Sequence, residues 1–78
     1  MQLSYDPRQN VAYLKFHDKT AEVETVRISE AMLVDLAPDG TVYGIELLNA
    51  NEQLLGKGAG PLILTNEATG QATQVQLP

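Results

Sequence analysis

Three carboxylates lie close to one tight turn in the sequence. Asp35 and Glu46 fall in segments that flank Ala37-Pro38-Asp39-Gly40, so strands on either side of this turn would bring them near each other. Two close carboxylates can shift each other's pKa values or bind a hard cation. With Tyr43 beside them, Asp35 and Glu46 are the candidate ligand-site residues. The alternative is a turn aspartate and two carboxylates on a solvated strand face.

Other residues that carry chemistry are scarce. The chain has no cysteine and a single histidine, which excludes disulfides, thiolate catalysis and cysteine or multi-histidine metal sites. His17 is a candidate general base, but no serine or cysteine near it in the sequence is placed as a nucleophile would be. The glycines of Gly56-Lys57-Gly58-Ala59-Gly60 precede a proline, whereas a phosphate loop connects a strand to a helix N-terminus. We therefore expect a non-enzymatic protein with no catalytic residue, cofactor or metal.

Length and charge narrow the class of protein further. The chain of 78 residues, 44% of them hydrophobic, predicts one small folded domain. Its net charge is −5 and its five cations are scattered, which opposes nucleic-acid binding. No apolar run approaches the ~20 residues of a membrane span, and the first residues do not have the pattern of a signal peptide. We expect no membrane association and a cytoplasmic location.

The elements that must position these residues are short strands. Alternation of apolar and polar residues predicts strands over 2–5, 11–16, 21–28, 32–36 and 42–48, separated by turn residues. The last of these is the most apolar and is expected at the centre of the sheet. The phase slips between Val23 and Val26, so either a bulge lies near Glu24-Thr25 or this is an edge strand.

The pattern changes after the fifth strand. Asn49 is a candidate N-cap for a short helix over 50–55, which Gly56 would end. A glycine-rich connector follows, and then β-prone segments over 62–65 and 73–77 predict a second hairpin, with a frayed tail as the alternative. The predicted fold is mainly β (α+β): an antiparallel β-meander of about five short strands with one short helix and a C-terminal β-hairpin. Residues 1–55 form the meander and helix, and 56–78 belong to the same domain or are swapped onto a partner.

Two stretches resemble a known family. Tyr5-Asp6-Pro7 precedes Val11-Ala12-Tyr13-Leu14, and Val34-Asp35-Leu36 precedes Asp39-Gly40 and the run Val42-Tyr43-Gly44-Ile45-Glu46-Leu47-Leu48-Asn49-Ala50. Their order and spacing resemble the small bacterial family catalogued as domain of unknown function 2283, over roughly residues 3–50. The family commonly has an aspartate where this chain has Asn10, and the tail after Ala50 has no counterpart in it. The resemblance implies a compact β-meander with a short helix, and no established activity or catalytic residues.

A thin, cysteine-free sheet with exposed edges needs reinforcement, and self-association is the remaining means. We therefore expect a homo-oligomeric protein-interaction module, in which the C-terminal hairpin adds strands to a neighbour's sheet. Its apolar residues are the interface candidates: Leu62, Leu64, Val75 and Leu77. One alternative is an acidic, antitoxin-like subunit that binds a small basic protein partner. Another is a ligand or enzyme site between subunits around Asp35, Tyr43 and Glu46.

Overall fold

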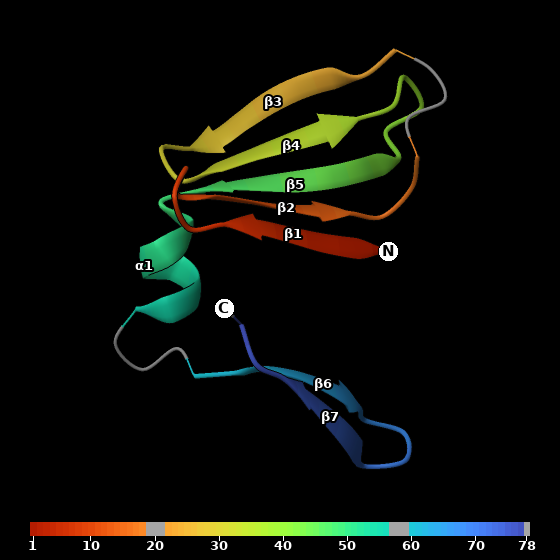
Figure 1. Ribbon diagram of the computed structural model, residues 1–78. Coiled ribbons are helices and arrows are strands. Elements are labelled where there is room, and N and C mark those ends of the chain that lie inside the picture. The colour runs from red at the N-terminus through yellow and green to blue at the C-terminus, as the bar shows by residue number, and fades with distance from the viewer. Residues whose placement is uncertain (19–21, 57–59, 78) are drawn as a thin grey trace.

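The fold is mainly β. The computed structural model describes residues 1–18, 22–56 and 60–77. Five strands form one antiparallel sheet, a short helix follows, and the last two strands form a separate hairpin (Figure 1). In chain order the elements are β1 (Gln2–Asp6), β2 (Val11–Lys15), β3 (Glu24–Ser29), β4 (Met32–Leu36), β5 (Val42–Leu48), α1 (Ala50–Leu55), β6 (Leu62–Asn66) and β7 (Gln71–Val75). The predicted five-stranded antiparallel sheet, single short helix and C-terminal hairpin are confirmed.

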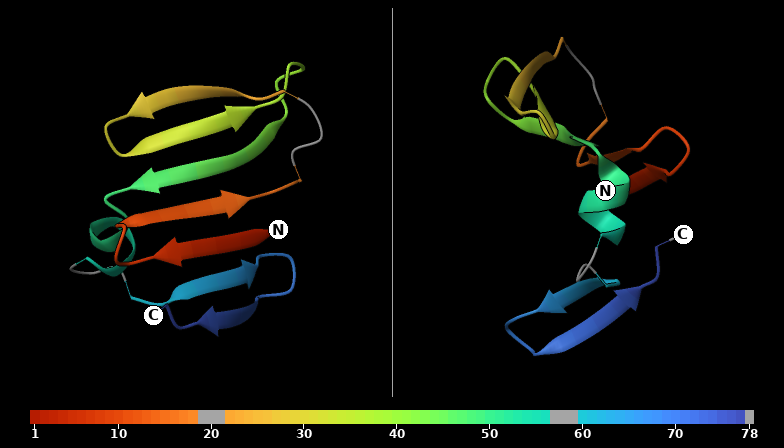
Figure 2. Two further views of the ribbon diagram at one scale, coloured as in Figure 1. Left: turned by 45° about the horizontal axis from the view of Figure 1, so that its top comes forward. Right: turned by 90° about the vertical axis from the view of Figure 1, so that its left-hand side faces the viewer.

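The order of strands in the sheet is β1-β2-β5-β4-β3. The strand predicted to be central, β5, therefore does lie in the middle, between β2 and β4. From β2 the chain crosses to the far edge to form β3 and then returns through β4 to β5 (Figure 2). As a result β1 and β3 are the two edges of the sheet, and the strand richest in apolar residues has neighbours on both sides.

The register collects apolar side chains on one face of the sheet. Leu3 pairs with Leu14, Leu14 with Ile45, and Leu47 with Met32, and residues directly opposite one another share a face. We call this the apolar face. It comprises Leu3, Tyr5, Leu14, Met32, Val34, Ile45 and Leu47. The only helix in the described ranges lies at one end of this face, where its Leu54 joins Ile45 and Leu47 in lining one cavity.

The edge strand β3 differs from its prediction. It begins at Glu24, and Thr25 pairs regularly with Asp35, so a bulge near Glu24-Thr25 is wrong. The irregularity lies between Arg27 and Ser29 instead, where Ile28 is the extra residue and is 61% exposed. The prediction of an edge strand with mixed faces describes β3 correctly, because only one of its sides has a neighbour that enforces the register.

Asn49 occupies the predicted N-cap position and the helix spans 50–55 as predicted, but the Asn49 side chain does not cap the helix. Asn49 has a left-handed backbone, with φ 54°, and its side chain makes no capping hydrogen bond. A capping side chain folds back onto the helix from an extended backbone, which Asn49 does not have. Asn10, in the β1–β2 turn, takes this role: its Oδ1 accepts a hydrogen bond of 2.8 Å from the amide of Asn51, and its carbonyl accepts one of 3.1 Å from Ala50.

Asn51 completes the attachment of α1 to the β1–β2 hairpin. Its Oδ1 accepts a hydrogen bond of 2.6 Å from the hydroxyl of Tyr5, and its Nδ2 donates one of 3.1 Å to the carbonyl of Pro7. We call Tyr5, Pro7, Asn10 and Asn51 the helix clasp. A helix of six residues cannot form alone, so these contacts and the burial of Ala50 hold it in place. The tyrosine and the proline of the tyrosine-aspartate-proline pattern therefore help to hold α1 on the sheet.

The C-terminal segment forms the predicted hairpin rather than a frayed tail. Its second strand is β7, Gln71–Val75, which begins and ends two residues earlier than predicted. The turn closes at Gly70, whose φ of 77° suits glycine and whose amide donates a 2.8 Å hydrogen bond to the carbonyl of Asn66. The predicted connector falls partly on 57–59, outside the described residues.

No helix within 1–18, 22–56 and 60–77 has the length and apolar character needed to cross a membrane.

Removal of the clasp acceptor should destabilise the sheet domain. We expect Asn10→Ala to lower the free energy of unfolding by about 1–2 kcal/mol. Alanine offers no acceptor to Asn51, and it tolerates poorly the positive φ that Asn10 has in the structure. Asn10→Asp should keep the native stability, because a carboxylate also accepts this hydrogen bond. Urea unfolding at one fixed protein concentration measures both, with Gln9→Ala, exposed in the same turn, as the control. Equal stability of all three variants would contradict the role of the clasp.

Candidate functional site

A polar network crosses the sheet on the face opposite the apolar one. The carboxylate of Asp35 accepts hydrogen bonds from two hydroxyl groups: Tyr13 donates to Oδ2 at 2.8 Å and Thr25 donates to Oδ1 at 2.6 Å. Asp35 is only 9% exposed. A buried carboxylate is stable in a protein when donors satisfy its oxygens, and these hydroxyls supply them from β2 and β3.

Gly44 makes the network possible. It pairs with Lys15 on one side and Asp35 on the other, so it separates the strands that carry Tyr13 and Asp35. A Cβ atom at Gly44 would collide with the Tyr13 hydroxyl and would lie 2.8 Å from the carbonyl oxygen of Leu14. The absence of a side chain there lets the tyrosine ring lie across β5. The network thus ties four strands together: β2, β5, β4 and β3.

Two of the three candidate ligand-site residues share a face. Glu46 pairs with Tyr13 and with Leu33, which places it on the same face as Asp35. Tyr43 is 8% exposed and lies where the register between β4 and β5 shifts, between Val42 and Gly44. The structure therefore brings Asp35 and Glu46 to one face, whereas Tyr43 lies at the irregularity of β5.

The remaining polar candidates have local roles. Asp39 accepts a 2.9 Å hydrogen bond from the amide of Thr41, and hydrogen bonding by Thr41 lowers the pKa of this turn carboxyl. Asp18, beside the exposed His17, forms a 3.0 Å ion pair with Lys15, whose hydrogen bond and charge lower the pKa of the Asp18 carboxyl. Such exposed pairs contribute little to stability. Within the described ranges, no group of three or more His, Cys, Asp or Glu side chains is placed to hold a metal ion.

The apolar face of the sheet is the other candidate for a functional site. A cavity of about 300 Å³ opens on it, and every residue that lines it is apolar. These residues are Leu3, Leu14, Met32, Ile45, Leu47, Leu54 and Leu62. The apolar residues that are buried in the described part of the chain are few and mostly small, namely Ala12, Tyr43 and Ala50. The larger side chains of the apolar face are only partly buried, so one copy of the chain covers this face incompletely.

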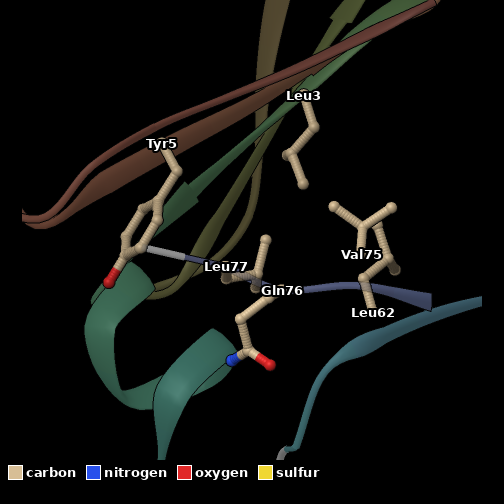
Figure 3. A pocket seen from close by; sticks show the side chains of 6 residues that line it. All are labelled: Leu3, Tyr5, Leu62, Val75, Gln76 and Leu77. Carbon is tan, nitrogen blue, oxygen red and sulfur yellow. The ribbon is translucent and has the colours of Figure 1, made fainter.

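A second cavity separates β1 from the hairpin. Its volume is about 330 Å³, and Leu3 and Tyr5 face Leu62, Val75 and Leu77 across it (Figure 3). Of the predicted interface residues, Leu64 alone does not line it. Leu3 and Leu62 line both cavities, so the two cavities lie next to each other. Alternation in the sequence predicts the face of the strand on which most of these residues lie. Only the folded structure shows that they are neighbours.

Comparison with known proteins identifies the family of the sheet. A family model described as protein of unknown function (DUF2283) matches residues 2–51 of the 78. The chain belongs to the DUF2283 family. This confirms the resemblance in the sequence, and the match covers all five strands of the sheet and the start of α1. None of the curated proteins and none of the solved structures matches the chain. The DUF2283 match thus includes the clasp and the Asp35 network but not the C-terminal hairpin.

A structural role of the Asp35 network has a measurable signature. We expect Tyr13→Phe to lower the free energy of unfolding by about 0.5–1.5 kcal/mol, because it removes a hydroxyl donor but keeps the ring over Gly44. Thr25→Val should have a similar effect. The decrease in the free energy of unfolding of the double variant should differ from the sum of the two single decreases, because both hydroxyls bind one carboxylate. Urea unfolding measures the cycle, with Thr65→Val as the control from an exposed strand. Strict additivity would show that the two contacts are independent.

Proposed function

We propose that the protein is a non-enzymatic interaction module that self-associates through the apolar face of its sheet. The observation that carries this proposal is the open cleft on that face, lined by apolar residues alone. A sheet with one apolar face is stable in water when a second layer covers it. In the described chain, α1 covers one end, and most of the face lies open.

The exposed area and the radius of gyration of the chain both indicate that a second layer is missing. The chain exposes 5820 Å², whereas a compact monomer of this length exposes about 4,700 Å². Its radius of gyration is 14.1 Å, compared with about 11.5 Å for a compact domain of equal length. The surplus area, about 1,100 Å², exceeds the roughly 800 Å² that each partner buries in a typical stable interface. A second copy would supply the missing cover from its own apolar residues, which is why we favour a homodimer.

The polar features support a binding role over an enzymatic one. Asp35 accepts hydrogen bonds from Tyr13 and Thr25 and is buried. Glu46 stands on its face, and Tyr43 lies where the β4–β5 register shifts. A general acid or base must reach a substrate proton. The Asp35 carboxylate is buried and its oxygens already accept these hydrogen bonds, so it is poorly placed for that role.

A matched pair of variants on β4 tests the proposal. Met32 and Leu33 are neighbours whose side chains point to opposite faces, and both are partly buried. Light scattering and sedimentation should show the native protein as a dimer or larger. Met32→Lys should weaken this association at least about 100-fold, because it would bury an unpaired charge. Leu33→Lys, close to Glu46 on the opposite face, should leave the association unchanged.

The same measurement distinguishes the alternatives. Circular dichroism of both variants checks that the sheet has folded. A native protein that is a folded monomer at every accessible concentration would overturn self-association. In that case a basic partner recovered in a stoichiometric complex would instead identify the chain as the acidic subunit of a hetero-complex, for which its net charge of −5 is suited.

A further inference from the structure

The hairpin of β6 and β7 has an apolar face of its own. Leu62 pairs with Val75 and Leu64 with Thr73, so Leu62, Leu64 and Val75 lie on one face of the hairpin. Every residue of both strands is exposed, and Leu64 is 72% exposed. A two-stranded hairpin is at best marginally stable in water unless it packs against something. The hairpin therefore needs a surface, just as the sheet needs a cover.

The hairpin does not cover its own sheet. It lies beyond the β1 edge, on the side away from β2 and β5, in each of the views (Figures 1 and 2). Leu62, Val75 and Leu77 face β1 residues across a cavity rather than filling it. Of the hairpin residues, Leu62 is the one that lines the cavity over Met32, Ile45 and Leu47. The centre of the apolar face thus stays open to a second molecule.

Charge favours the hairpin as the contact element between two copies. Residues 1–55 contain nine carboxylates and four cations, so these segments carry the net charge of −5 and repel each other. Residues 60–77 carry a single charge, that of Glu67 at the turn. A nearly neutral hairpin can approach the acidic sheet of another copy without this repulsion, whereas two bare sheets would bring the like charges together.

We infer that two copies exchange hairpins. This inference rests on the self-association proposed above and names the segment that performs it. The face formed by Leu62, Leu64 and Val75 packs on the Met32, Ile45 and Leu47 region of the partner's sheet, and the reverse contact forms by symmetry. The helix clasp holds α1 on its own sheet, so the exchange begins after α1. The sequence there, Gly56-Lys57-Gly58-Ala59-Gly60, has three glycines and imposes little steric restriction on a change of path.

Disulfide trapping tests the exchange, because the native chain has no cysteine. Leu64→Cys places a thiol on the hairpin, and Met32→Cys places one on the sheet. The two single variants are unfolded together, refolded as a mixture and oxidised mildly, with one of them carrying a mass tag. We expect the mixed, tagged–untagged crosslinked dimer as the main product. The control replaces Met32→Cys with Leu33→Cys, on the opposite face of the same strand, and should lose this product.

A variant that carries both Leu64→Cys and Met32→Cys in one chain tests whether the hairpin packs on its own sheet. If the hairpin instead closes on its own sheet, this variant will form an intrachain disulfide and remain a monomer on a non-reducing gel, which would overturn the exchange. Sedimentation of the native protein separates the two proposals. A dimer without the mixed crosslink contradicts hairpin exchange and leaves self-association in place. A monomer without any crosslink contradicts both.

Discussion

An uncovered apolar face is the constraint on which the rest of this structure depends. In the described part of the chain the five-stranded sheet forms one layer, and a sheet must bury its apolar side against another layer. Here α1 covers one end of that side, and β6–β7 projects past the edge rather than over it. The large apolar side chains that would fill a core, such as Leu14, Ile45 and Leu47, line an open cleft instead. The hydrophobic term that dominates folding is therefore incomplete in one copy. This shortfall is the physical basis of the self-association that we propose.

Specific polar contacts hold the single layer in shape. On one side Asn10 and Asn51 attach α1 to the β1–β2 turn, and on the other Asp35 joins hydroxyls from two other strands. Both sets lie within the residues that match the DUF2283 family, and Gly44 belongs with them because it leaves room for the Tyr13 ring. Asn10, Asn51 and Asp35 thus have roles in the architecture of the fold.

The fold was more predictable than the site. Strand positions follow from alternation with a period of two, which the backbone of a strand imposes on any sequence. The bulge at Ile28 was not predictable, because an edge strand accepts an extra residue at several places. The N-cap position of α1 was predicted correctly, but the residue that supplies the capping acceptor was missed. Asn49 has the right residue type and position, but the acceptor comes from Asn10, which is close only once the hairpin has folded. Of the candidates Asp35, Tyr43 and Glu46, the strand register brings Asp35 and Glu46 to one face, whereas Tyr43 lies where the β4–β5 register shifts.

The sequence by itself determined the composition-dependent properties of the protein. These are its small size, its acidity, its lack of cysteine, its short strands and its membership of a family recognisable from local motifs. Only the tertiary structure decided which strands are neighbours, and so which alternating residues merge into one apolar face. It also placed the hairpin beyond β1. The physical reason is that periodicity is encoded locally. Strand order depends on contacts between residues such as Leu14 and Ile45, which are distant in the chain and meet only when the whole sheet forms.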